Sequence, residues 1–248
     1  MSPKPKVTID VLIPAYNEAD ALPELLAEID RGLLRRILVV DNASTDGTGE
    51  VARQHGAEVA QCPTPGYGAA CLAGMAYLRQ DPPDILVFLD GDRSDHPRFM
   101  PSLVDPIVAD EQDMVLGSRV LGTAEKGSLN GTQRFGNWLS TFLMRLCWGI
   151  RYTDLGPFRA IRWTQLEAIG MTDTNFGWTI EMQIRAHLAG LRTTEVPVDY
   201  RNRIGVSKIS GTISGCFKAG TKILYTIFKY RMGGGLGSRA SEEQQVTK

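Results

Sequence analysis

The chain lacks several features that mark common protein classes. Its 248 residues include three histidines at no metal-ligand spacing and four widely separated cysteines without a C-x-x-C pair. We therefore expect reduced, mostly buried thiols rather than disulfides. No G-x-G-x-x-G motif follows the first predicted strand, which argues against a dinucleotide-dependent dehydrogenase. No window supplies the roughly 20 apolar residues of a membrane span.

Charge and composition are also unexceptional. A net charge of −1 creates no global field that would attract nucleic acid, so we expect no nucleic-acid partner. No apolar run of signal-peptide length precedes the first predicted strand, and we expect a cytoplasmic chain. With 43% hydrophobic and 22% charged residues, the chain is long enough for one large domain with its own core.

Short apolar strands alternate with helical patterns through the first half, which predicts a mostly parallel α/β sheet covered on both faces. The expected strands cover residues 7–14, 36–41, 58–61, 85–90, 158–162 and 193–200. The expected helices cover residues 18–31, 48–55, 67–78, 134–150, 164–169, 177–189 and 213–231.

Acidic residues end two of these strands. Asp41 closes RILVVD, and Asp90 closes ILVFLD with Asp92 two residues on. In an open parallel sheet, ligands bind beyond the carboxyl ends of the strands. Two carboxylates separated by Gly91 can face one Mg²⁺ or Mn²⁺ ion, which would neutralise a departing diphosphate. Asp and Gly also form ordinary turns, but the strongly apolar strand before them favours the metal site.

The polar segments after the first two strands allow two interpretations. Asn17 is suited to cap one helix, and Thr45 or Asp46 to cap the next. Capping does not explain Asp41, because a carboxylate at the strand end itself commonly accepts hydrogen bonds from a base or a ribose. Helix capping and nucleotide contact therefore both remain open for the segment that contains Asn17.

Three motifs in this order and spacing, LIPAYNE, VVDNASTDGT and FLDGD, resemble glycosyltransferase family 2 over residues 7–231. The resemblance implies a GT-A fold, that is, a Rossmann-like, mostly parallel sheet flanked by helices, in a single domain that ends in an amphipathic helix. It also implies that Asp41 contacts the nucleobase and that the aspartate pair binds metal and diphosphate. The donor contacts are then expected at Pro14, Tyr16, Glu18, Asp41, Asn42, Asp90, Gly91 and Asp92.

The second half resembles the polyprenyl-phosphate branch of this family, which includes dolichyl-phosphate mannose synthases. The motifs are GSR at 117–119, Arg134 with Asn137, FR at 158–159, GW at 177–178 and RIGVSK at 203–208. The resemblance implies that Arg119 and Arg134 hold the acceptor phosphate and act beside Asp90 and Asp92 in catalysis. It assigns donor phosphates to Arg203, Ser207 and Lys208, and further acceptor contacts to Asn137, Asp154 and Trp178. Solvated surface charge is the alternative for each arginine, and core packing is the alternative for Trp178.

We therefore expect an inverting, metal-dependent transfer of a sugar from a UDP- or GDP-linked donor to a polyprenyl phosphate. The catalytic domain would span residues 1–231, with a nucleotide and metal half over 7–118, an acceptor half over 119–231 and a disordered polar tail over 232–248. Departures from the family pattern at residues 93–96, 154–159 and 178–183 leave the sugar and the nucleotide open.

Two other functions are compatible with these motifs. A sugar or polysaccharide hydroxyl acceptor would need a carboxylate base, for which Asp154, Glu181 and Asp95 are the candidates. A phosphate monoester is already largely ionised at neutral pH and needs none. A non-catalytic nucleotide-binding subunit would have no need of the complete set of acidic and basic motif residues.

Two amphipathic helices indicate contact with a membrane. The helix over 134–150 carries a wide apolar stripe, and the helix over 213–231 adds the cations Lys218, Lys222, Lys229 and Arg231. Such helices suit a peripheral enzyme on the anionic inner face of a membrane, with or without a separate membrane partner. The alternative for both helices is packing onto the sheet.

Overall fold

One seven-stranded sheet organises the chain in the computed structural model, which describes residues 7–205 and 213–233. The strands are β1 (Ile9–Ala15), β2 (Arg36–Asp41), β3 (Glu58–Gln61), β4 (Ile85–Phe88), β5 (Met114–Ser118), β6 (Arg159–Arg162) and β7 (Thr193–Pro197). Their order is β3-β2-β1-β4-β6-β5-β7, and β6 runs antiparallel to both of its neighbours while the other pairs are parallel. The expected mostly parallel sheet is confirmed.

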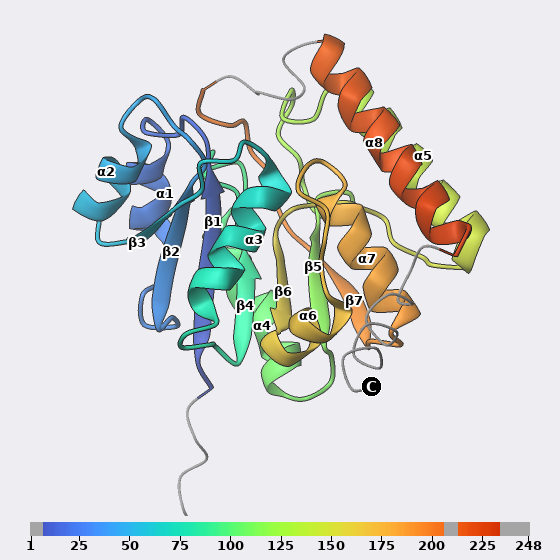
Figure 1. Cartoon of the computed structure of the whole chain (residues 1–248), viewed down its shortest axis with the longest axis horizontal. Coiled ribbons are helices and arrows are strands. Elements are labelled where there is room, and N and C mark those ends of the chain that lie inside the picture. The colour runs from blue at the N-terminus through green and yellow to red at the C-terminus, as the bar shows by residue number, and fades with distance from the viewer. Residues whose placement is uncertain (1–6, 206–212, 234–248) are drawn as a thin grey trace, which may run out of the picture.

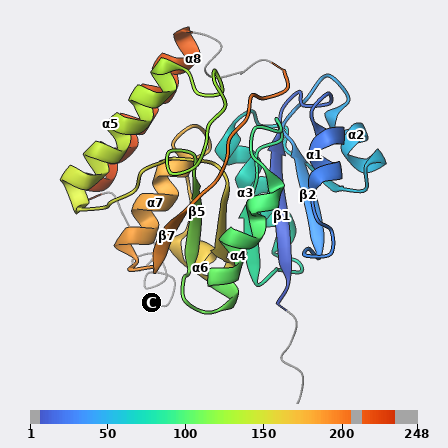
Figure 2. The same ribbon diagram turned by 180° about the vertical axis from the view of Figure 1, so that it is seen from behind.

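Helices cover both faces of this sheet. α1 (Leu22–Glu28), α2 (Thr48–Gln54) and α4 (Met100–Val108), preceded by the 3₁₀ turn η1 (Pro97–Phe99), pack on one face. α3 (Tyr67–Leu78), α6 (Trp163–Ile169) and α7 (Trp178–Leu188) pack on the other, as Figures 1 and 2 show from opposite sides. Successive strand residues point to opposite faces, so Val11 and Ile13 join the first core and Leu12 the second.

Two further helices lie side by side beside α7, at one end of the molecule (Figures 1 and 2). They are α5 (Gly131–Trp148) and α8 (Ile213–Arg231), and they share a third apolar cluster with α7. A capping box between Asn130 and Gln133 starts α5 three residues before the predicted position. Over the ranges that the structure describes, no helix is long and apolar enough to cross a membrane.

Several other predicted boundaries were wrong as well. α1 begins at Leu22 rather than at residue 18, because residues 18–21 form a turn and Pro23 suits a first helical turn. β4 ends at Phe88, which leaves Asp90 in the loop that follows. β7 ends at Pro197, which lacks the N–H of a ladder donor, and Tyr200 makes only isolated bridges. Residues 234–248 of the predicted tail lie outside the described residues.

Gly74 allows α3 to approach the sheet closely. A Cβ at this position would collide with Leu12 and lie 2.8 Å from Val40 Cγ2. We therefore expect Gly74→Ala to lower the free energy of unfolding by about 1–3 kcal/mol. The matched variant Gly136→Ala in α5 meets open space, and it should raise the free energy of unfolding by up to about 1 kcal/mol. Urea denaturation measures both, and shifts of the same sign would contradict this account.

Candidate functional site

A cavity of about 410 Å³ opens at the carboxyl ends of β1 and β4. The loops after these strands, the start of α3 and the segment before α7 form its walls. This is the edge at which open parallel sheets bind ligands. The structure brings together eight of the predicted donor residues in its lining: Pro14, Tyr16, Glu18, Asn42, Asp90, Gly91, Asp92 and Arg203.

Asp92 is held by its own loop and by an arginine. Its Oδ1 accepts hydrogen bonds from the backbone N–H of Ser94 at 2.8 Å and from the hydroxyl of Ser94. Its Oδ2 lies 2.7 Å from Arg203 Nη2. The same guanidinium lies 3.5 Å from Glu18 Oε1. Arg203 therefore links two walls of the cavity across residues that are far apart in the sequence.

Asp90 differs from Asp92 in its hydrogen bonding. Its Oδ1 is buried and has no hydrogen-bond partner among the described residues. Burial and the nearby charge of Asp92 raise the pKa of Asp90 to about 7, against a hydrogen bond from Tyr67 that lowers it. A carboxylate in this position is destabilised until a positive charge reaches it.

These two aspartates fit a divalent cation. Mg²⁺ and Mn²⁺ take oxygen ligands, and Mg²⁺ in particular keeps several positions for water and substrate phosphate. Asp90, whose Oδ1 has no partner among the described residues, and Asp92 both line the cavity. The described residues contain no group of three or more His, Cys, Asp or Glu side chains that could hold a metal. Such an arrangement suits an ion that is bound together with a phosphate-bearing substrate.

The predicted base contacts at the end of β2 are placed differently. Asp41 is not part of the cavity lining; its oxygens accept hydrogen bonds from Ser44 N at 3.0 Å and Gln61 Nε2 at 3.2 Å. Asn42 lines the cavity, but its amide bonds to the backbone of residues 62, 64 and 66. Asn42 thus shapes the wall of the cavity, and its contact with the donor stays a prediction. Ser207 and Lys208 lie outside the described residues.

Two predicted acceptor residues bind each other. Arg119 Nε and Nη2 both lie 2.7 Å from the carboxylate of Asp154, and the backbone N–H of Arg119 donates to it as well. The guanidinium stacks on the ring of Tyr200 at 5.0 Å. Burial would raise the pKa of Asp154, but the charge and hydrogen bonds of Arg119 outweigh it and lower that pKa. Asp154 thus engages Nε and Nη2 of Arg119 in the fold, and the contact of Arg119 with the acceptor phosphate stays a prediction.

The other acceptor candidates have three different environments. Asn137 of α5 donates to Thr153 O at 2.9 Å and accepts from Leu155 N at 2.8 Å, so it fixes the loop that carries Asp154. Arg134 is exposed in the first turns of α5. Trp178 is 1% exposed and packs edge-to-face on Phe88, so it cannot stack on an acceptor as predicted.

Comparison with known proteins decides the family. The family model described as glycosyl transferase family 2 matches residues 10–176. The chain belongs to this family. It is 35% identical over 210 residues to a dolichyl-phosphate hexose transferase of Haloferax volcanii, with 83% of this chain and 88% of that protein covered. It is 31% identical over 216 residues to an undecaprenyl-phosphate mannosyltransferase of Micrococcus luteus, with 82% and 88% covered.

The fold of this glycosyltransferase is also found among solved structures. A glucosyl-3-phosphoglycerate synthase of Mycobacterium tuberculosis, crystallised with Mn²⁺, uridine diphosphate and glucosyl-3-phosphoglycerate, superposes with a TM-score of 0.72 at 22% identity. The match covers 94% of this chain and 82% of that one. The GT-A fold that the sequence resemblance implied is therefore confirmed.

The three candidate bases of the glycosyltransferase are not equally available. Asp154 is paired with Arg119, and Glu181 accepts hydrogen bonds from Thr172, Asp173 and Tyr230. Asp95 is fully buried, and neither of its oxygens has a partner among the described residues. Burial raises the pKa of Asp95 well above its usual range. None of the three lines the cavity.

Sequence reasoning missed one wall of the cavity. Its residues are Pro65, Gly66, Tyr67 and Ala70 near the start of α3, with Asn175 and Phe176 before α7. These two segments meet through a hydrogen bond from Ala69 N to Thr174 O of 2.9 Å. A contact across about 100 residues leaves no periodic signal, although the glycines at 66 and 68 mark a close backbone approach.

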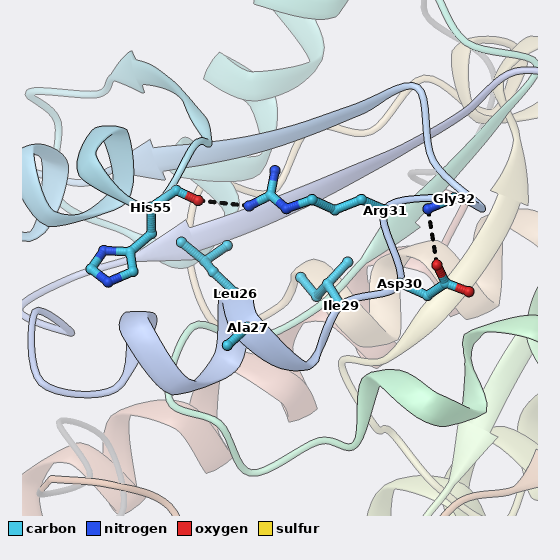
Figure 3. A pocket seen from close by; sticks show the side chains of 7 residues that line it. All are labelled: Leu26, Ala27, Ile29, Asp30, Arg31, Gly32 and His55. Carbon is cyan, nitrogen blue, oxygen red and sulfur yellow. Dashed lines mark hydrogen bonds between the residues drawn. The ribbon is translucent and has the colours of Figure 1, made fainter.

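A second hollow, of about 430 Å³, lies at the opposite edge of the sheet (Figure 3). It is lined by the end of α1 and by His55 after α2. Arg31 donates to the carbonyl oxygens of His55 at 2.6 Å and Gly56 at 3.0 Å, so its charge serves to tie two helix ends together. We assign this hollow to packing.

The buried Arg119–Asp154 ion pair should make a large contribution to the free energy of unfolding. Asp154→Asn leaves a buried guanidinium uncompensated, and we expect a loss of about 3 kcal/mol in the free energy of unfolding at pH 7. Because the pKa of Asp154 is lowered in the folded chain, this contribution is present above the ordinary aspartate pKa of about 4 and is lost as pH falls through the lowered value.

Denaturation from pH 7 down to pH 3 measures this contribution, with Asp199→Asn as the matched control. Asp199 pairs with Arg98 at the surface, so its loss should change little. An equal effect of the two substitutions at pH 7 would contradict the structural role of the buried pair.

Proposed function

We propose that this glycosyltransferase moves a hexose from a nucleoside-diphosphate sugar to a polyprenyl phosphate. The observation that carries the donor part is the cavity at the strand ends, where Asp90, Asp92 and Arg203 converge. The names of the relatives, a dolichyl-phosphate hexose transferase and an undecaprenyl-phosphate mannosyltransferase, support the acceptor part. Whether the donor is UDP- or GDP-linked is a question for the assay below.

Asp90 and Asp92 would hold a Mg²⁺ or Mn²⁺ ion. When bound, the ion supplies positive charge to the diphosphate as it departs. Arg203 lies beside Asp92 and offers a planar fork to phosphate oxygens, so it would share this role. Tyr16 is 44% exposed at the rim of the cavity and can cover a base or a ribose.

The acceptor chemistry fits a phosphate better than a hydroxyl. A phosphate monoester has a second pKa near 6 and can attack the anomeric carbon in line without giving up a proton, which inverts the configuration. A hydroxyl would need a carboxylate base within reach. Asp154 and Glu181 are committed to hydrogen bonds, which favours the acceptor that needs no base. Arg134, exposed on α5, is a cation that an acceptor phosphate can meet.

The acceptor lipid would bring this enzyme to a membrane surface, on its cytoplasmic face. Large apolar side chains on α5 and α8 are exposed, and Trp138 stacks on Phe142 at 5.6 Å while both rings remain exposed to solvent. These side chains are Phe135, Trp138, Phe142 and Leu146 on α5, and Leu224, Tyr225 and Phe228 on α8. Neither helix contains an acidic residue, whereas the whole chain has a net charge of −1. Aromatic and basic helix faces of this kind suit an anionic bilayer surface.

Transfer should depend on the aspartate pair and on the cation. Asp90→Asn and Asp92→Asn should each lower kcat at least about hundredfold, because transition-state charge stabilisation worth several kcal/mol is lost. Chelation of the divalent cation should have the same effect and be reversed by Mg²⁺ or Mn²⁺. Released UDP or GDP and the glycosyl lipid are measured with a short-chain polyprenyl phosphate.

The control is Asp105→Asn, at an exposed position on α4, which should match the wild type. Donor turnover without a lipid product would favour a hydroxyl acceptor. Failure to bind any nucleotide would reject the enzymatic proposal in favour of a non-catalytic role.

Vesicle binding tests the membrane location separately. Replacing Trp138 and Phe142 together by serine should reduce binding to phosphatidylglycerol-rich vesicles at least about tenfold, because both aromatic rings would otherwise leave water. The matched control replaces Tyr77 and Val108, which are exposed on other helices. If the Trp138 and Phe142 double variant sedimented with vesicles as the wild type does, the membrane location would be contradicted. It would also be contradicted if the wild type formed a dimer through these side chains and the double variant were monomeric.

A further inference from the structure

The segment between α6 and α7 forms one wall of the donor cavity. Asn175 and Phe176 line the cavity from this side. The side chain of Asp173 fixes their backbone, because its Oδ1 accepts hydrogen bonds from Asn175 N at 2.7 Å and Gly177 N at 3.1 Å. Asp173 is itself only 7% exposed at its side chain. The position of the wall therefore follows the position of one buried carboxylate.

α8 contacts this segment at three points. Lys222 Nζ lies 2.9 Å from Asp173 Oδ2. Thr226 packs against Gly177, where a Cβ would come within 2.7 Å of the threonine hydroxyl. Tyr230 donates a hydrogen bond of 2.6 Å to Glu181, and Glu181 in turn accepts from the backbone N–H of Asp173 at 2.7 Å.

These three residues of α8 are spaced by four and therefore lie on one face of the helix. We define this face by Lys222, Thr226 and Tyr230, and call it the anchoring face. It is half-buried or buried along its length, in contrast to Tyr225 and Phe228, which point to solvent at 61% and 68% exposure. The polar contacts of α8 are thus directed at the segment before α7.

We propose that the anchoring face of α8 positions the Asn175–Phe176 wall, so that Asp173 and Lys222 are positioning residues for binding of the nucleotide sugar. The proposal rests on the proposed function, since it takes the cavity to be the donor site. It assigns a donor-side role to a helix whose outer face we placed at the membrane. A displacement of α8 would then change donor affinity.

The physical reason is the cost of an unpaired buried charge. Without the ammonium group of Lys222, the carboxylate of Asp173 has to reach water. Turning it outward breaks its hydrogen bonds to Asn175 and Gly177, and the wall loses its support. Glu181 still holds residues 172 and 173, so the segment is displaced rather than unfolded.

The test measures binding of UDP and of GDP in the presence of Mg²⁺, together with the donor KM and kcat of the transfer reaction. Lys222→Gln should weaken nucleotide binding and raise the donor KM about threefold to thirtyfold. The kcat at saturating donor should stay within about twofold of the wild type, because no group that touches the reacting atoms has changed. Lys222→Arg keeps a cation opposite Asp173 and should restore the wild-type KM.

Two further variants keep the result decisive. Asp173→Asn keeps an acceptor oxygen for the N–H groups of Asn175 and Gly177 and carries no charge that has to reach water, so it should keep a KM close to that of the wild type. The double variant Lys222→Gln/Asp173→Asn should therefore return the raised KM of Lys222→Gln toward the wild-type value. Arg231→Gln removes an exposed cation from the same helix and should leave the KM unchanged.

A lower melting temperature with an unchanged KM in Lys222→Gln would overturn the proposal while leaving the donor site intact. So would a double variant whose KM stays as high as that of Lys222→Gln. Absence of nucleotide binding in the wild type would overturn the proposal and the proposed function together.

Discussion

Several carboxylates are buried near the carboxyl ends of the strands, and the rest of the site depends on how their negative charge is compensated. Asp92, Asp95 and Asp154 are buried, and one oxygen of Asp90 is buried without a partner in the described part of the chain. Arg119 neutralises Asp154 and Arg203 reaches Asp92, which leaves Asp90 and Asp95 without a direct ion pair there. Charges in such a position are stable only if more positive charge arrives or a proton is taken up. A phosphate-bound divalent cation would meet that requirement, so the proposed donor and metal would bind together.

The two arginines respond to this constraint in different ways. Arg119 donates from Nε and Nη2 to the carboxylate of Asp154, and the face of its guanidinium lies over the ring of Tyr200. Its hydrogen-bonding capacity is therefore largely used within the fold. Arg203 shares one nitrogen between Asp92 and Glu18, and its Nε has no partner in the described residues. A ligand phosphate can replace these contacts at small cost. Arg119 is thus part of the scaffold, and Arg203 is the group that can exchange partners.

Sequence reasoning succeeded where topology alone decides the outcome. Parallel strands place their carboxyl ends at one edge, so acids and turns at the ends of apolar strands had to meet, and Pro14, Tyr16 and Asp92 do. Sequence reasoning failed where the outcome depends on which side chains form ion pairs or hydrogen bonds with each other. Asp154 lies 35 residues from Arg119 and binds its Nε and Nη2, and the amide of Asn42 bonds to the backbone of its own chain. Spacing shows that a charged or polar group is present at an edge, but it does not show whether that group is already paired. The sequence did not predict the cavity wall at Asn175 for a related reason, because a tertiary contact with α3 assembles this wall.

α8 shows why amphipathic pattern alone could not orient a helix. A helix on the surface of a soluble domain normally buries its aromatic residues and exposes its lysines. Here Lys222 turns inward to a buried aspartate, while Phe228 and Tyr225 face outward. The inversion is stable because Asp173 requires a cation, and the apolar contacts of Ile223 and Ile227 with the cluster around α7 add to it. Both rings remain mostly exposed, so a helix of this design gains stability when an apolar phase covers its outer face. The Lys222–Asp173 ion pair, which turns a lysine of α8 inward, therefore also connects the outer surface of this helix to the wall of the donor cavity.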